Sequence, residues 1–104
     1  MKYIVITTTF EDKQQAHDLA KLLLDEHLIS CAQVSEISSM YHWKGEIVDT
    51  TEYIVTMKSK ESLYQQIENI IKSNHPYDVP QIIAIPIIHG SKEYLEWIDN
   101  TTIN

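Results

Sequence analysis

The segment His75-Pro76-Tyr77-Asp78-Val79-Pro80 joins a helical pattern to the apolar run Ile82-Ile83-Ala84-Ile85-Pro86-Ile87-Ile88. Its two prolines fix their own φ angles and bias the residues before them toward extended geometry, so this corner of the chain is stiff. A stiff corner can hold an imidazole, a phenol and a carboxylate in fixed orientations, which a ligand site needs. The alternative interpretation is an ordinary helix stop followed by the start of a strand.

Strand and helix patterns alternate on both sides of this corner. Runs of β-branched and aromatic residues predict strands, and apolar residues spaced three and four apart predict amphipathic helices. The predicted elements are a strand over 3–7, a helix with its apolar stripe over 16–27, strands over 29–43 and 47–58 joined by a turn at 44–46, a helix with its stripe over 63–71, a strand over 82–88 and a short helix from 91. This order predicts an α+β, ferredoxin-like βαββαβ fold with a long central hairpin and a short C-terminal helix, forming one domain over residues 1–104.

The first long strand contains a change in the parity of its apolar residues. Ala32 and Val34 share one parity, whereas Ile37, Tyr41 and Trp43 share the other. One extra residue in a strand exchanges its two faces. The pattern therefore predicts a β-bulge near residues 35–36.

Composition and charge exclude several classes of protein. The chain has 104 residues and a net charge of −7, and its eight basic residues are all lysines. An acidic chain without arginine is poorly suited to nucleic-acid phosphates or to an anionic membrane surface. The single cysteine, Cys31, cannot form an internal disulfide, and the N-terminal segment turns polar too soon for a signal peptide. We therefore expect a soluble, cytoplasmic protein with no nucleic-acid or membrane partner.

The length of the two central strands predicts an oligomer. At about 3.3 Å per residue they form a hairpin roughly 40 Å long, whereas a compact chain of this size has a radius of gyration of about 13 Å. The hairpin must overhang its own domain and leave apolar side chains, Met40, Tyr41 and Trp43 among them, in water. The overhanging edge also has unpaired N–H and C=O groups that invite a strand from another chain. Burial against neighbouring subunits in a closed assembly solves both problems.

Several segments carry a resemblance to a known family, and together they cover the chain in that family's order. Tyr41-His42-Trp43-Lys44-Gly45-Glu46, with Glu52 downstream, resembles the hairpin signature of the CutA family, the divalent-cation tolerance proteins. The segment 75–82 resembles that family's most specific motif, and 29–34, 58–59 and 94–97 resemble its second strand, its strand-to-helix junction and its closing helix. The resemblance implies a ferredoxin-like homotrimer with a role in tolerance of, or response to, divalent metals, copper in particular.

The resemblance also implies a copper site, which this sequence keeps only in part. Some family members are proposed to bind copper through a cysteine at the end of the first strand and two adjacent histidines before the proline. Thr8 stands at the cysteine position and Asn74 at the first histidine position, so His75 alone remains. One imidazole with hydroxyl and amide oxygens offers too few nitrogen or sulfur donors for a tight copper site. We expect weak binding of Cu²⁺ or another divalent metal by His75, with Thr8 beside it.

A second set of residues is expected to bind a ligand or to form the subunit interface. The expected ligand-binding residues are Tyr41, Trp43, Glu52, Lys58 and Tyr77, and the expected interface residues are Met40, Tyr41, Trp43 and Trp97. For the tryptophans, packing in the trimer is the favoured interpretation. For His75, Tyr77 and Lys58, packing and ligand binding are equally supported, because a rigid loop beside a cation and a phenol suits an anion or another small ligand.

Two interpretations of function therefore stay open. The first is a trimeric divalent-cation tolerance protein, and the second is a trimeric regulatory module that binds a small metabolite or anion in clefts between subunits. A relative of the PII signalling proteins is disfavoured, because 44–46 is a tight turn and not a long mobile loop. The sequence contains no GxSxG, HExxH or P-loop motif, so we expect no enzymatic activity.

Overall fold

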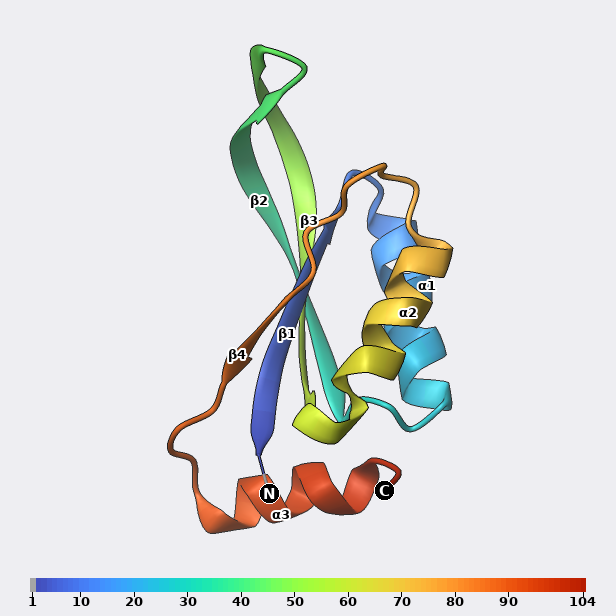
Figure 1. Cartoon of the computed structure of the whole chain (residues 1–104), viewed down its shortest axis with the longest axis vertical. Helices are drawn as coiled ribbons and strands as arrows, with labels where there is room; N and C mark the ends of the chain where they lie inside the picture. Colours follow the sequence, from blue (N-terminus) through green and yellow to red (C-terminus); the bar gives the residue numbers. More distant parts are fainter. Residues whose placement is uncertain (1) are drawn as a thin grey trace.

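The computed structural model describes residues 2–104, which form a four-stranded antiparallel sheet and three α-helices (Figure 1). The elements are β1 (Tyr3–Phe10), α1 (Lys13–Asp25), β2 (Cys31–Trp43), β3 (Glu46–Lys60), the 3₁₀ turn η1 (Glu61–Leu63), α2 (Tyr64–Asn74), β4 (Ile83–Pro86) and α3 (Lys92–Thr101). The strands lie in the order β2-β3-β1-β4. The predicted α+β, ferredoxin-like fold is confirmed.

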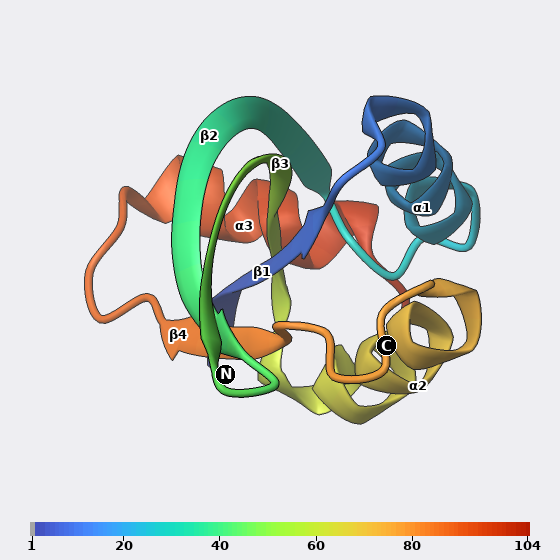
Figure 2. The ribbon, with the colours of Figure 1, turned by 90° about the horizontal axis from the view of Figure 1, so that it is seen from above.

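One face of the sheet is covered by α1 and α2, which lie side by side (Figures 1 and 2). Alternate residues of β1 point toward these helices, because successive side chains of a strand point to opposite faces. Ile6 and Phe10 of β1 are fully buried there with Leu23 of α1 and Ile67 of α2. The apolar stripes of both helices thus meet one side of one sheet, as the spacing predicts.

The hairpin of β2 and β3 extends well beyond the two helices (Figure 1). It gives the molecule a longest dimension of 44 Å at a radius of gyration of 14.3 Å. Pairing runs without interruption from Cys31 opposite Lys58 to Trp43 opposite Glu46. The predicted β-bulge is therefore wrong. Ala32 and Val34 pack against the core beneath the helices. Ile37, Tyr41 and Trp43 lie on the other face of the same unbroken strand.

The opposite end of the molecule is closed by α3 (Figure 1). Ser91 caps this helix by accepting a hydrogen bond from the Tyr94 N–H, as expected for a hydroxyl at that position. Lys60, at the end of β3, is only 2% exposed, and its ammonium lies 3.1 Å from an Asp99 carboxylate oxygen. This ion pair fixes the helix against the end of the sheet. Across residues 2–104, no helix has the length and apolarity that a membrane crossing requires.

The last strand is shorter than predicted. The expected strand over 82–88 is reduced to Ile83–Pro86, which pairs with β1 at the edge of the sheet. Pro86 pairs with Ile4 inside this edge strand, and the next N–H, that of Ile87, still donates a hydrogen bond of 2.9 Å to the Tyr3 carbonyl. An edge strand tolerates proline where its missing N–H would face away from the neighbouring strand. The preceding segment, 75–82, forms a loop beside the end of β1.

Candidate functional site

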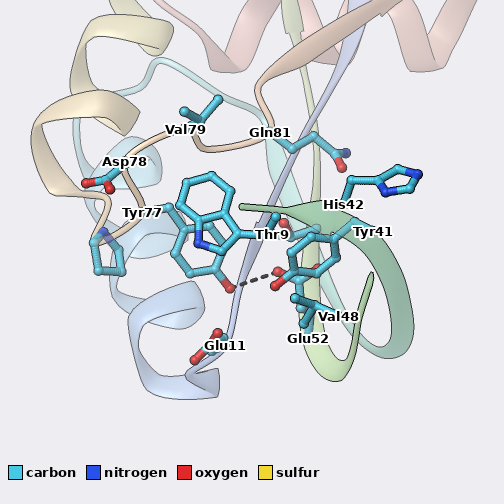
Figure 3. Close-up of a pocket in the computed structure, with 12 residues that line it drawn as sticks. Thr9, Glu11, Tyr41, His42, Val48, Glu52, Tyr77, Asp78, Val79 and Gln81 are labelled. Carbon is cyan, nitrogen blue, oxygen red and sulfur yellow. Dashed lines mark hydrogen bonds between the residues drawn. The ribbon is translucent and has the colours of Figure 1, made fainter. Parts of the chain in front are cut away.

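A pocket of about 650 Å³ opens where the hairpin leaves the body of the sheet (Figure 3). It lies between the end of β1, the hairpin and the corner 75–80. Its lining residues are Thr9 and Glu11 at the end of β1, Tyr41, His42, Trp43, Val48 and Glu52 of the hairpin, and Pro76, Tyr77, Asp78, Val79 and Gln81 of the corner and the residue after it.

Glu52 and Tyr77 form the centre of this pocket. The Glu52 side chain is only 5% exposed, and the Tyr77 hydroxyl donates a hydrogen bond of 2.8 Å to its Oε2 atom (Figure 3). Burial and this hydrogen bond raise the pKa of Tyr77 well above its ordinary value of 10.0. The phenol therefore stays protonated and holds the carboxylate in one orientation. The stiff corner provides this orientation, as the two prolines predict.

His75 is held beside the pocket by contacts to its own chain. Its ring stacks on Phe10 with the centroids 4.1 Å apart. Its Nε2 lies 2.7 Å from the Thr9 carbonyl oxygen, and its Nδ1 lies 3.2 Å from the Tyr77 backbone nitrogen. Because a carbonyl can only accept and an N–H can only donate, the ring is the neutral tautomer with its proton on Nε2. Burial lowers the pKa of His75 below its ordinary value of 6.5, which favours the same neutral form.

The other residue of the expected metal site, Thr8, lies inside the fold. Its side chain is fully buried, and its Oγ1 has no hydrogen-bond partner among the described residues. No group of three or more His, Cys, Asp or Glu side chains within residues 2–104 is arranged to hold a metal ion. Metal binding at His75 and Thr8 therefore stays a prediction, and it would require His75 to give up one of its two hydrogen bonds.

Four of the five expected ligand-binding residues line the pocket, namely Tyr41, Trp43, Glu52 and Tyr77. The fifth, Lys58, does not. It follows Glu52 by six residues along β3, which is about 20 Å at the rise of a strand, and its ammonium lies 2.6 Å from the Gln33 side-chain oxygen. Within one chain, the structure therefore does not bring Lys58 to the corner.

The expected interface residues lie at two ends of the molecule. Met40 is 74% exposed and Trp43 is 40% exposed, and both lie in the far part of the hairpin. Trp97, also 40% exposed, lies on α3 at the other end (Figure 1). Its ring is 5.5 Å from that of Tyr94. The predicted interface therefore consists of two separate patches on one chain.

Sequence patterns did not single out Glu11 as a pocket residue, whereas Asp78 is the carboxylate that the stiff corner was expected to hold for a ligand. Glu11 follows the end of β1, and Asp78 lies within the corner. Their joint position depends on the packing of the corner against β1, which no local pattern encodes. The only available signal for Glu11 was that it directly follows the first strand. Together with Glu52, Glu11 and Asp78 make the pocket acidic, and no lysine is among its lining residues.

Comparisons with known proteins agree with this fold. A model of the CutA1 divalent ion tolerance protein family matches residues 4–101. The divalent-cation tolerance protein CutA of Pyrococcus horikoshii is 38% identical over 99 residues, which cover 95% of this chain and 97% of that protein. The crystal structure of CutA1 from Oryza sativa superimposes with a TM-score of 0.94 at 36% identity, covering 99% of this chain and 95% of that one.

Other relatives are longer than this chain. The protein CutA homolog of Danio rerio is 40% identical over 87 residues, or 83% of this chain, but the match spans only 58% of that protein. The match to the chloroplastic protein CutA of Arabidopsis thaliana covers 97% of this chain at 36% identity and spans 56% of that protein. Because that relative is named as chloroplastic, the cytoplasmic location expected here stays a prediction. The chain belongs to the CutA1 divalent ion tolerance protein family.

Proposed function

We propose that this protein acts in the tolerance of divalent cations, copper among them, as a homotrimer that binds its ligands without catalysing a reaction. Membership of the CutA1 divalent ion tolerance family over residues 4–101 carries this proposal. Fold does not imply function, so the proposal depends on the site and the assembly as well.

The distribution of exposed apolar residues supports a trimer. A cyclic trimer joins two different patches of the same chain, whereas a two-fold dimer joins one patch to itself. Met40 and Ile47 at the hairpin tip are 74% and 73% exposed, and Tyr94 and Trp97 on α3 form a second patch at the other end. Both edges of the sheet, β2 and β4, are also free to pair with another chain. A head-to-tail ring would bury each hairpin tip on a neighbour.

The hydrogen bonds of His75 support weak rather than tight metal binding. A metal at Nδ1 must displace the hydrogen bond from the Tyr77 N–H. A metal at Nε2 must displace the proton that Nε2 donates in its hydrogen bond to the Thr9 carbonyl. Metal and proton also compete for the same lone pairs. Copper affinity should therefore fall as the pH drops through the His75 pKa, which burial places below 6.5.

Calorimetric titration with Cu²⁺ tests the metal part of the proposal. We expect dissociation constants of about 1 µM or weaker, as suits a single imidazole among oxygen donors. His75→Ala should remove most of the pH-dependent binding and leave the trimer intact, whereas His17→Ala, on the exposed side of α1, should change neither. Nanomolar affinity that survives His75→Ala would contradict the proposed site.

A second candidate function is favoured by the pocket beside Glu52. A cavity of about 650 Å³ lined by aromatic and polar side chains is of the size that holds small organic ligands. The protein would then act as a regulatory module that binds a small molecule, and the trimer would place such pockets near its subunit contacts. Retention of a ligand by the trimer in the absence of any divalent metal would distinguish this function from metal tolerance.

A further inference from the structure

The pocket contains a buried negative charge that its own chain does not balance. Glu52 is 5% exposed, and among the described residues its only hydrogen-bond donor is the neutral Tyr77 hydroxyl, at Oε2. The other oxygen, Oε1, has no donor within residues 2–104, and it is accessible from the pocket, because Thr8 Oγ1 is the one fully buried side-chain polar atom without a partner in these residues. A buried carboxylate is costly unless a cation or several hydrogen bonds compensate it. The lining contains no lysine, and the chain contains no arginine.

The remaining walls of the pocket suit a cation. Tyr41, Trp43 and Tyr77 contribute three aromatic rings, and the carboxylates of Glu11 and Asp78 add negative charge. The faces of aromatic rings attract ammonium groups. Trp43 already has this contact within the chain, because the Lys44 ammonium lies 5.8 Å from its ring centroid. The pKa of Tyr41 is raised by burial and then by the charges of Glu52 and Glu11, which is consistent with a negative potential in the pocket.

The same features disfavour the other classes of ligand. An anion would face three carboxylates with no lysine in the lining to receive it. A bare metal ion needs several donors converging on one point, and the described residues contain no such group. An organic cation can instead spread its contacts over a cavity of about 650 Å³.

We infer that this pocket binds the ammonium group of an organic amine, which donates a hydrogen bond to Oε1 of Glu52 and packs against the rings of Tyr41 and Trp43. Tyr77 acts as a positioning residue that fixes Glu52 through Oε2. This inference rests on the second function proposed above and names its ligand class.

Three probes of nearly equal shape test the charge of the ligand. Benzylamine is a cation at pH 7, benzyl alcohol is neutral and benzoate is an anion. Calorimetry on the metal-free protein at low salt should detect benzylamine and should find the other two at least about tenfold weaker, because a hydrogen bond to a charged group and a cation–π contact are both lost. Equal binding of all three, or preferential binding of benzoate, would overturn the inference.

Two variants with a matched control locate the binding. Glu52→Gln keeps an acceptor for Tyr77 but removes the charge, so it should weaken benzylamine binding by about tenfold or more. Glu36→Gln alters an exposed glutamate on the same hairpin that accepts a hydrogen bond of 3.2 Å from Tyr53, and it should leave binding unchanged. Lys44→Met removes a competing cation near Trp43. It should preserve or strengthen benzylamine binding, whereas it would weaken the binding of an anion.

Light scattering on the same samples separates this inference from the proposed assembly. If Glu52→Gln loses benzylamine binding and keeps the oligomeric state of the wild type, the inference is supported. If benzylamine does not bind the wild type and Glu52→Gln dissociates the oligomer, a cation of a neighbouring subunit balances Glu52 and the inference is wrong, although the trimer stands. If the wild type is a monomer that binds benzylamine, the inference holds and the proposed trimer fails.

Discussion

At the scale of single residues, Thr8 is the side chain whose buried polar group lacks hydrogen bonding. Its Oγ1 is fully buried with no hydrogen-bond partner among the described residues. A buried hydroxyl without a partner costs about 1–3 kcal/mol. Thr8→Val keeps the shape of the side chain and removes the hydroxyl, so we expect it to raise the free energy of unfolding by about 1 kcal/mol. Urea unfolding at one fixed protein concentration measures the change.

The neighbouring threonine provides the control for this substitution. Thr7 lies on the other face of β1, where its Oγ1 accepts a hydrogen bond of 3.0 Å from the Gln81 side chain. Thr7→Val leaves that donor without its acceptor and should lower stability. If Thr8→Val is also destabilising, the Thr8 hydroxyl has a partner in solution, such as a buried water.

His75 shows how far single-residue predictions reach. The position of an imidazole at a stiff corner could be predicted from Pro76 and Pro80. The hydrogen bonds of both ring nitrogens, to Thr9 and Tyr77, could not be, because they depend on how the corner packs against β1. Those hydrogen bonds decide the tautomer, and with it the competition that a metal would face.

At the scale of elements, the hairpin turn follows from its two central residues. Lys44 and Gly45 have φ angles of 51° and 80°, and a two-residue turn with both angles positive matches the twist of the flanking strands. A Cβ atom at Gly45 would have no heavy atom within 4 Å. The cost of Gly45→Ala is therefore purely conformational.

We expect opposite effects from substitutions at these two positions. Gly45→Ala should destabilise the protein by about 1 kcal/mol, and Lys44→Asn should stabilise it by a few tenths of a kcal/mol or more, since asparagine tolerates positive φ better than lysine. Thermal unfolding of both variants at equal concentration tests the pair. A Gly45→Ala variant as stable as the wild type would mean that the turn changes its type in solution.

At the scale of the whole molecule, the overhanging hairpin is the feature that a single chain leaves unexplained. Trp43 is 40% exposed near the tip, and Met40 and Ile47 are more exposed still. Trp43→Ala should weaken the proposed trimer by about 2–4 kcal/mol, the usual cost of truncating a buried interfacial aromatic residue. Light scattering over a dilution series should show dissociation at a higher concentration than for the wild type.

His42, the neighbour of Trp43 on β2, provides a control for the Trp43→Ala substitution. It is exposed and points to the opposite face from Trp43, because the two residues are adjacent on one strand. His42→Ala should leave the oligomeric state unchanged. A wild-type protein that is monomeric at micromolar concentration would contradict the assembly itself.

The sequence by itself determined the order of the elements, the turn at Lys44-Gly45, the stiff corner and the unusual length of the hairpin. These features depend on local chemistry, namely the φ limits of proline and glycine and the spacing of apolar residues. The relation between Glu52 and Tyr77, 25 residues apart, was decided by the tertiary structure alone. The tertiary structure also decided the distance of Lys58 from the corner. It likewise decided that β2 pairs with β3 without a bulge, although Val34 and Ile37 lie on opposite faces of the strand. Strand register and the packing of a loop on a sheet edge join distant parts of the chain, so no local pattern encodes them.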